Sequence, residues 1–317
     1  VPRRESKSGL GHRGFEIHAD PHLPLPMAAA RRDFTINAVY LDPLTGEVAD
    51  PWGGLDDLEA RRLRHTSDAF AEDPLRVLRG MQLISRYELA ADPETVAACR
   101  RVTPEGLARE RLFGEWEKLL TRGRRPSLGL GFLQDTGWLA YYPGLVALRG
   151  CPQDPRWHPE GDVWAHTGHC LDVFAGERSG DRTEDLIVGL AVLCHDLGKP
   201  GTTEIVDGHV RAYGHEGLGG TLTRRFLARL TDSSALVAAV RDWREGITDN
   251  RLWTIPLMGN GDTDSALYLD GLNLTYADYP RFSADGRWLA LRSEYTLALV
   301  DVAAQTATFL EDFEPGN

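Results

Sequence analysis

The chain has 317 residues, which is enough for two or three domains with cores of their own. Its 42% hydrophobic and 26% charged residues are typical of globular proteins, no apolar run approaches the length of a membrane span, and the formal net charge of −12 argues against general nucleic-acid binding. Residues 1–5 do not resemble a secretory signal, so we expect a cytoplasmic protein without a membrane segment. The chain has four scattered cysteines, Cys99, Cys151, Cys170 and Cys194, with no CxxC spacing. This pattern argues against a zinc ribbon or a disulfide framework and fits a reducing compartment.

Positive charge is concentrated in the first half of the chain, whereas the acidic excess lies mostly elsewhere. A basic face on this half is one interpretation, and ordinary solvated helix faces are the other. The arginine runs are Arg31-Arg32, Arg61-Arg62-Arg64, Arg100-Arg101, Arg109-Arg111 and Arg122-Arg124-Arg125.

The predicted elements change character along the chain. Residues 34–41 form a strand-like run that is followed by a turn at 42–46 and a returning strand at 47–49. Apolar residues then recur at helical spacing from about Asp68 to Leu139, with a joint at 122–126.

The second half of the chain begins with a segment rich in proline and glycine, residues 143–159. A second helical block follows, from Asp162 to about Trp243. Residues 266–309 alternate apolar and polar side chains, and residues 280–290 resemble a strand pair of a β-propeller blade. A single blade cannot bury its own faces, so this tail differs in kind from what precedes it.

Residues 72–79, Glu-Asp-Pro-Leu-Arg-Val-Leu-Arg, predict the start of a helix. Pro74 suits the first helical position and Asp73 suits the N-cap, which places Asp73, Arg76 and Arg79 close to one face. A carboxylate accepts a hydrogen bond from the amine of cytosine or adenine and repels the carbonyl of uracil or guanine. This face therefore favours C and A, and a capped helix with two surface arginines is the alternative.

Three other patterns occur with this one in a fixed order: RRDFTINA at 31–38, DPWGGLDDL at 50–58 and LARERLFGE at 107–115. Together the four patterns resemble the bacterial tRNA nucleotidyltransferase and poly(A) polymerase family over about residues 3–120. The resemblance implies that the first segment closes a catalytic palm, that residues 72–79 pair with CTP or ATP, and that the last pattern lies on a supporting neck helix. It implies nucleotide contacts by Arg31, Arg32, Asp33, Asn37, Asp73, Arg76 and Arg79, and support from Glu110 and Arg111.

The family holds Mg²⁺ on a DxD pair upstream of the RRDFTIN segment, where the ion clamps the triphosphate and activates the attacking 3′-hydroxyl. The thirty residues before Arg31 contain no DxD pair, and the chain starts with Val1 rather than methionine. We therefore expect an N-terminally truncated palm that lacks its Mg²⁺ ligands, and a polymerase-deficient chain.

A second constellation lies in the later helical block, where the His195-Asp196 doublet ends an apolar helix and His166 precedes it. Charge at such a place is costly unless it is paired or bound to metal. Imidazole and carboxylate ligands suit a divalent transition metal with open positions for water, which can then attack a phosphoester. For any one histidine, a hydrogen-bonded core residue is the alternative.

Residues 162–242, including Gly198-Lys199 after the doublet, resemble the HD phosphohydrolase superfamily. The resemblance implies a site for Mn²⁺, Ni²⁺, Co²⁺ or Fe²⁺ with His195 and Asp196 as catalytic residues. It implies the metal ligands His166, His195, Asp196 and Asp242, with Asp249 as the second choice for the last, and it leaves His169, His209 and His215 either to widen the site or to serve the fold.

The predicted fold is mainly α, with a partial α/β nucleotidyltransferase palm at the N-terminus and a short β tail. The expected domains are a partial palm at 1–66, a neck with nucleotide-selecting and RNA-binding helices at 67–125, a body or linker at 126–158, an HD domain at 159–250 and a propeller-like fragment at 251–317.

The leading functional hypothesis is template-independent addition of C or A to the 3′ end of tRNA from CTP and ATP, with an appended HD phosphohydrolase. A stand-alone HD-type phosphodiesterase or phosphatase and a degenerate, non-enzymatic tRNA-binding protein are the alternatives. CCA-, CC-, A- and poly(A)-adding enzymes share these motifs, so the sequence leaves the choice among them open, together with the oligomeric state.

Overall fold

The structure is a computed structural model that describes residues 23–156 and 158–248, together with the backbone of short strands nearer both ends of the chain. The chain divides into two units, Val1–Arg241 and Asp242–Asn317, and each is described by itself. None of the described helices is long and apolar enough to cross a membrane.

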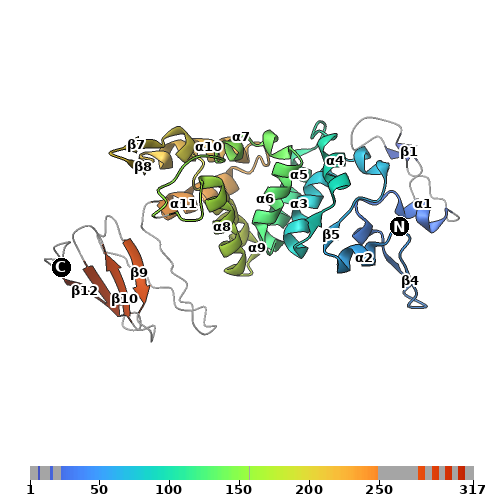
Figure 1. Cartoon of the computed structure of the whole chain (residues 1–317), viewed down its shortest axis with the longest axis horizontal. Coiled ribbons are helices and arrows are strands. Elements are labelled where there is room, and N and C mark those ends of the chain that lie inside the picture. Colours follow the sequence, from blue (N-terminus) through green and yellow to red (C-terminus); the bar gives the residue numbers. More distant parts are fainter. Residues whose placement is uncertain are drawn as a thin grey trace. The chain divides into compact units, whose positions relative to one another are not determined.

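Helices dominate the first unit (Figure 1). The α-helices are α1 Leu25–Ala29, α2 Gly54–Glu59, α3 Leu75–Tyr87, α4 Pro93–Arg100, α5 Arg109–Arg122, α6 Pro126–Asp135, α7 Pro143–Ala147, α8 Val163–Gly176, α9 Arg182–Cys194, α10 His215–Leu227 and α11 Ser234–Thr248, the last of which runs into the second unit. Short 3₁₀ helices are η1 Thr35–Asn37, η2 Asp68–Glu72, η3 Trp138–Tyr141 and η4 Lys199–Gly201.

Strands in the first unit are short and pair two by two. The antiparallel pairs are β1 Ser6–Lys7 with β2 Phe15–Glu16, β3 Tyr40–Leu41 with β4 Val48–Ala49, and β7 Glu204–Val206 with β8 His209–Arg211. The one parallel pair in the described part joins β5 Arg62–Leu63 to β6 Ala90–Ala91.

The second unit contains a four-stranded antiparallel sheet in which each strand pairs with the next along the chain. Its strands are β9 Asp278–Phe282, β10 Trp288–Arg292, β11 Leu297–Asp301 and β12 Thr306–Leu310. The β tail predicted from the sequence and its likeness to a propeller blade stay predictions, and the turn predicted at 283–286 lies outside the described residues.

The core of the first unit is a row of helices in which α3 packs on α5 and α6, α5 packs on α9, and α6 packs on α8 (Figure 1). The helical spacing predicted from the sequence is confirmed here, because Leu78, Met81, Trp116 and Leu119 are fully buried. The predicted joint at 122–126 is also confirmed, since α5 ends at Arg122 and α6 begins at Pro126.

An aromatic cluster ties the later helices to this row. The indole of Trp116 on α5 meets the ring of Tyr142 edge-on at 5.0 Å between centroids and donates a 3.0 Å hydrogen bond to its hydroxyl. Phe226 on α10 packs against the same indole at 5.5 Å. Edge-to-face contacts of this kind add to the free energy gained from burial, so α10 is held against α5.

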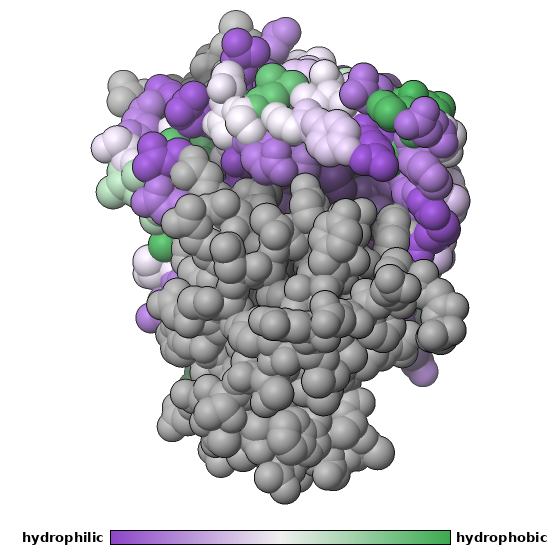
Figure 2. Space-filling model, turned by 90° about the vertical axis from the view of Figure 1, so that its left-hand side faces the viewer, coloured by the Kyte–Doolittle hydropathy of each residue, from purple (hydrophilic) through white to green (hydrophobic). Residues whose placement is uncertain are grey.

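Most of the surface seen in Figure 2 is hydrophilic where it is coloured, with hydrophobic residues scattered among polar ones. Scattered apolar side chains of this kind are normal on a protein surface. The coloured part of this face therefore offers no broad apolar patch.

The strand predicted over residues 34–41 is wrong for most of its length, because only Tyr40 and Leu41 belong to a strand and Thr35–Asn37 form η1. The cause is Asp33, whose Oδ1 accepts hydrogen bonds from the backbone N–H of Phe34 at 2.9 Å and from the Asn37 side chain at 3.1 Å. These local bonds curl the backbone at the point where an alternating apolar pattern indicates extension.

Close packing between α6 and its neighbours predicts a position-specific effect on stability. A Cβ added to Gly129 would lie 2.7 Å from both the Leu119 side chain and the backbone oxygen of Met81, whereas one added to Gly131 on the same helix meets nothing within 4 Å. Gly129→Ala is expected to lower the free energy of unfolding by about 1–3 kcal/mol through overpacking. Gly131→Ala is the matched control and should raise it by up to about 1 kcal/mol through helix propensity. Urea unfolding of both variants measures this, and equal effects would contradict the packing described.

Candidate functional site

Asp33 joins the RRDFTIN segment to α3. Its carboxylate is 6% exposed, and its Oδ2 accepts a 2.5 Å hydrogen bond from the Nε of Arg79 on α3. The charge of Asp33, together with this bond, overcomes the effect of burial and raises the pKa of Arg79 above its ordinary value. Because Asp33 also accepts hydrogen bonds from Phe34 and Asn37, it fixes the segment to the helix that carries the predicted nucleotide contacts.

Asp73 stands at the start of α3 and is held by the neck. Its Oδ1 accepts from the backbone N–H of Leu75 at 3.2 Å, and its Oδ2 accepts from Arg111 on α5 at 2.7 Å. Although burial opposes ionisation, the bond and the charge of Arg111 lower the pKa of Asp73 below its ordinary value. α3 begins at Leu75 with Pro74 as its N-cap, one residue later than predicted, and Asp73 still accepts from its first turn as an ionised carboxylate at neutral pH.

Arg76 lies beside Asp73 and is held by backbone oxygens. Its two terminal nitrogens donate to the carbonyls of Ala69 and Arg31, both at 2.6 Å. Burial is the main cause that lowers the pKa of Arg76, but arginine stays charged at any physiological pH. These two bonds fix the orientation of the guanidinium next to the carboxylate of Asp73.

The other predicted residues of this face lie at its edges. Arg31 contacts Glu72 at 3.4 Å, and the guanidinium of Arg32 lies 5.8 Å from the centroid of the Tyr40 ring. The Asn37 side chain donates a hydrogen bond to Asp33, and Glu110 is exposed on the first turn of α5. The structure thus gives two bonded pairs, Asp33 with Arg79 and Asp73 with Arg111, and places the charge of Arg76 near both carboxylates, whereas it gives Glu110 a peripheral place.

A carboxylate that sequence reasoning passed over holds the first two motifs together. Asp57 is fully buried at the end of the GGLDD pattern, and its oxygens accept from Thr35 Oγ1 at 2.6 Å, Arg62 Nε at 2.6 Å and Arg64 Nε at 2.9 Å. In the sequence, the glycine turn before Asp56 and Asp57 predicts the start of a helix. It does not predict which of these two aspartates is buried. Thr35 belongs to the RRDFTIN segment, so Asp57 holds that segment in place through this hydrogen bond.

The histidine–aspartate cluster forms where α8 and the end of α9 meet. Asp162 caps α8 by accepting from Ala165 N at 2.9 Å, and His166 follows on the first turns of that helix. His195 is the C-cap of α9 and donates from Nδ1 to the carbonyl of Val192 at 2.7 Å, which leaves its Nε2 facing Asp196 at 3.1 Å. The imidazoles of His166 and His195 lie 5.3 Å apart between centroids.

Asp196 is the centre of this cluster and is only 2% exposed. Burial acts to raise its pKa, but the facing charges of His195 and Lys199 outweigh burial and hold the pKa of Asp196 well below its usual range. Its Oδ2 lies 2.8 Å from Lys199 Nζ and 3.8 Å from His166 Nε2, yet no hydrogen bond of acceptable geometry reaches this oxygen from the described residues. A buried carboxylate oxygen in close ionic contacts but without a directed bond has capacity for a further cation.

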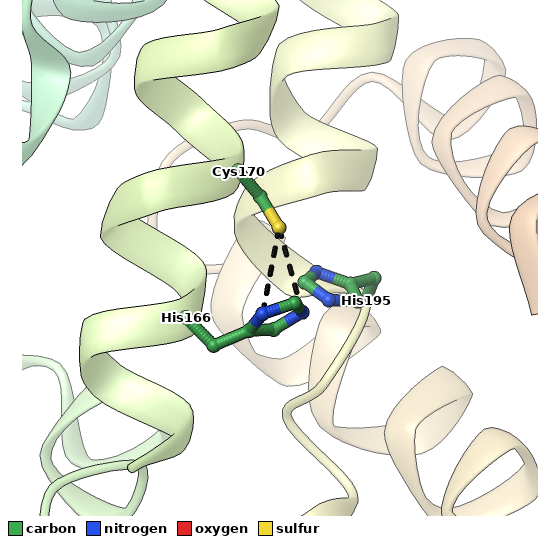
Figure 3. A group of neighbouring side chains, drawn as sticks. All are labelled: His166, Cys170 and His195. Atoms are coloured by element: carbon green, nitrogen blue, oxygen red, sulfur yellow. Dashed lines mark hydrogen bonds between the residues drawn. The ribbon is translucent and has the colours of Figure 1, made fainter. Parts of the chain in front are cut away.

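Two residues missed from the sequence complete the surroundings. Glu160 Oε1 lies 2.6 Å from His166 Nδ1, and although burial opposes ionisation, hydrogen bonds from its own backbone, His158 and His166 bring its pKa to about 2. Cys170 lies one helical turn after His166, with its Sγ 3.4 Å from Nε2 of that histidine (Figure 3), and burial raises the pKa of its thiol to about 12. The i, i+4 spacing of His166 and Cys170 was the signal for the second of these.

The remaining histidines separate into different environments. His215 faces the cluster, with its Nε2 3.8 Å from Asp196 Oδ1. His209 lies instead with Arg156 and Asp154, and His169 is exposed on α8. Asp242 is exposed on α11 at the start of the second unit, so its role as a ligand stays a prediction, and Asp249 lies outside the described residues.

The donors of the cluster fit a divalent transition metal. The Nε2 atoms of both histidines and Oδ2 of Asp196 face one another, and a ligand atom of Cys170 lies within 4.8 Å of those of His166 and His195. Since Nδ1 of each histidine is occupied by Glu160 or by a backbone oxygen, Nε2 is left to bind a metal.

Comparison with known proteins gives matches in the region that contains both sites. Residues 22–64 match the model of the poly A polymerase head domain. The "Multifunctional CCA protein" of Xanthomonas campestris pv. campestris (strain B100) is 44% identical over 207 residues, which cover 63% of this chain and 49% of that protein. The protein of the same name from Tolumonas auensis is 40% identical over 239 residues, covering 73% of this chain and 56% of that protein. The chain thus spans about half the length of these curated relatives.

Solved structures give weaker matches. A tRNA-processing enzyme in an apo form aligns with a TM-score of 0.46 at 20% identity, covering 72% of this chain and 57% of that chain. The Thermotoga maritima CCA-adding enzyme complexed with tRNA aligns with a TM-score of 0.43 at 18% identity, covering 70% and 48%.

The buried pairs of Asp57 predict a large loss of stability on neutralisation. Thr35, Arg62 and Arg64 outweigh burial and lower the folded-state pKa of Asp57, so its contribution is present above its unfolded pKa of about 3.9 and is lost as pH falls through the lower folded value. At pH 7, Asp57→Asn is expected to cost about 3 kcal/mol of unfolding free energy, because two arginines lose their partner.

Asp56→Asn is the matched control, since Asp56 is its exposed neighbour on α2 and should change stability by less than about 0.5 kcal/mol. Urea unfolding at pH 7 and pH 3 separates the two variants. Equal stability of both variants at pH 7 would contradict the role given to Asp57.

Proposed function

We propose that this chain, which is related by sequence to the bacterial tRNA nucleotidyltransferase and poly(A) polymerase family, selects CTP and ATP for addition to the 3′ end of tRNA in the cytoplasm. The observation that carries the proposal is that two oriented groups lie near each other. Asp73 is ionised and held by Arg111, and the guanidinium of Arg76 is fixed by two backbone carbonyls. The name shared by the curated relatives supports the reaction type, and tRNA, CTP and ATP are the partners we infer from it.

The geometry explains how a base would be chosen. Each carboxylate oxygen of Asp73 offers more than one lone pair, so the bonds from Leu75 and Arg111 leave capacity to accept from the exocyclic amine of cytosine or adenine. Arg76 has five N–H donors and uses two on backbone carbonyls, which leaves others for a ring nitrogen or carbonyl. A base with a carbonyl in place of the amine would face a negative charge.

Nucleotidyl transfer in the family uses Mg²⁺ held by two aspartates, and the residues present do not supply that pair. No DxD occurs before Arg31, and in the described part of the chain Asp33 and Asp73 are already engaged by Arg79 and Arg111. We therefore derive no step of transfer from these residues. Nucleotide binding is the property that they can carry, and binding is the readout that tests the proposal.

Base selection predicts a specific response to loss of one carboxylate. The chain should bind CTP and ATP at least 10-fold more tightly than UTP and GTP, and Asp73→Ala should reduce that preference by about 10- to 100-fold, since a good side-chain pair to a base is worth about 1–3 kcal/mol. Asp68→Ala, which removes an exposed carboxylate from the neighbouring η2, is the control and should leave the preference intact. Titration calorimetry measures all twelve affinities, four nucleotides with each of the three proteins, and equal binding of CTP and UTP by the unaltered chain would reject the proposal.

We infer a second activity, metal-dependent hydrolysis of a phosphoester, for the histidine–aspartate cluster. The supporting observation is the buried Oδ2 of Asp196, which lacks a directed hydrogen bond and faces Nε2 of both His166 and His195. Bound Mn²⁺, Ni²⁺, Co²⁺ or Fe²⁺ would supply a nucleophilic hydroxide. The chain's own part is to orient the imidazoles through Glu160 and Val192, and to balance the charge of Asp196 with Lys199.

Metal binding to this cluster is tested by calorimetric titration of the chelator-treated chain with Mn²⁺ and Ni²⁺. We expect one strong site that is weakened at least 100-fold by His195→Ala, because the metal loses a ligand whose Nε2 faces the carboxylate. His169→Ala removes an exposed histidine from α8 and is the control that should bind as tightly as the unaltered chain. Equal binding by the two variants would exclude the assigned ligands.

The non-enzymatic alternative makes a different prediction for the same experiments. A chain that only binds tRNA through its arginines would show no preference for CTP over UTP and no metal site that depends on His195. The nucleotide and metal titrations therefore separate it from both proposed activities.

A further inference from the structure

Four arginines that are far apart in the sequence line one open pocket of about 410 Å³. They are Arg61 after α2, Arg86 at the end of α3, and Arg122 and Arg124 at and after the end of α5. Tyr87 and two leucines complete the lining, so no acidic side chain faces this space. We call it the arginine pocket.

These arginines differ from the others in the same runs of sequence. Arg62 and Arg64 are paired with Asp57, Arg111 is paired with Asp73, and Arg109 and Arg125 contact Asp232 and Asp172. Within the described residues, by contrast, none of the four arginines of the pocket makes an ion pair with a carboxylate. A concave site with four such cations in a chain of net charge −12 concentrates positive potential and attracts a polyanion.

Helix stabilisation does not explain the group. A basic residue in the last turn of a helix interacts favourably with the helix dipole, which accounts for Arg86 on α3 and Arg122 on α5. It does not account for Arg124, or for Arg61, whose φ of 50° lies in the left-handed region that a non-glycine residue adopts at a cost. The gathering of all four side chains around one space needs a further cause.

The position of the pocket suggests its ligand. α3 begins beside Asp73 and α5 carries Arg111 on its first turn, so both helices have the nucleotide-selecting residues at one end and the arginine pocket at the other. The 13 residues of α3 span about 20 Å at 1.5 Å per residue. A single bound nucleotide cannot reach both ends, whereas a nucleic-acid strand can.

We propose that the arginine pocket binds phosphates of an RNA backbone several nucleotides away from the 3′ end that the nucleotide-selecting face serves. This inference rests on the proposed function, because it takes tRNA as the partner. Its lining of guanidiniums, leucines and one tyrosine offers phosphate contacts and a ring on which a base can stack. Contacts from guanidiniums to phosphates carry no sequence information, so the binding expected of this pocket is independent of sequence.

The test measures binding of a labelled tRNA transcript that lacks its terminal CCA, by fluorescence anisotropy between 50 and 300 mM salt. The variant Arg61→Gln/Arg122→Gln/Arg124→Gln removes three exposed charges from the pocket. The control Arg101→Gln/Arg149→Gln/Arg225→Gln removes three exposed charges from elsewhere in the first unit, so both proteins have the same net charge. CTP binding and a thermal melt are measured on both.

The pocket variant is expected to bind tRNA about 10- to 100-fold more weakly at 100 mM salt, with a slope of log K against log salt reduced by about two to three. The control variant should keep the slope of the unaltered chain, and both should keep its CTP affinity. A trinucleotide with the same 3′ end spans only about 10 Å and should bind the pocket variant and the unaltered chain equally. Arg124→Gln alone should reduce the slope by about one.

The outcomes separate this inference from the proposed function. If the unaltered chain binds no tRNA, the partner assigned under the proposed function is wrong, and the inference that the arginine pocket binds RNA is rejected as well. If the unaltered chain binds tRNA but the pocket variant keeps the same slope and affinity, only the present inference is overturned. A pocket variant that loses CTP affinity to the same extent as tRNA affinity would also overturn it.

Discussion

A buried carboxylate is tolerated only when a cation or several hydrogen bonds accompany it, and this constraint organises the first unit. Asp33 and Asp57 are both buried, and each is paired with arginine. Asp33 joins its segment to α3 through Arg79, and Asp73 joins α3 to α5 through Arg111. Asp57 is paired with the nearby Arg62 and Arg64, and its hydrogen bond from Thr35 joins α2 to η1. The face proposed to select the nucleotide depends on these pairs, because the strands near it in the described residues form only two-stranded pairs.

The same constraint separates two sets of arginines with different chemistry. Arg62, Arg64 and Arg111 are paired with carboxylates and join parts of the fold, whereas those of the arginine pocket keep their charge available for a ligand. The buried Asp196 of the histidine–aspartate cluster is likewise accompanied by cationic groups, namely Lys199 and two imidazoles. None of them makes a directed hydrogen bond to its Oδ2. A metal ion would satisfy that oxygen better than these groups do.

Local patterns predicted what depends on neighbours in sequence. The hydrogen bond from Leu75 to Asp73 and the buried stripe of α3 follow from spacing alone, and the predicted resemblance to the nucleotidyltransferase and poly(A) polymerase family agrees with the head-domain match at residues 22–64 and with relatives that are 40% and 44% identical. What depends on tertiary pairing was not predictable. Three features can be seen only in the folded chain. They are the burial of Asp57, the contact between Glu160 and His166, and the position of four arginines around one pocket. The strand expected at 34–41 was lost for a local reason, since hydrogen bonds from Phe34 and Asn37 to Asp33 override β propensity there.

The central claim is that Asp73 and Arg76 contact the base of the incoming nucleotide. A crystal structure of the chain with bound CTP tests it most directly. The account predicts that the exocyclic amine of cytosine lies about 3 Å from the carboxylate of Asp73, with the Arg76 guanidinium on the neighbouring edge of the ring. A base bound elsewhere, with Asp73 contacting only Arg111 and Leu75, would contradict it.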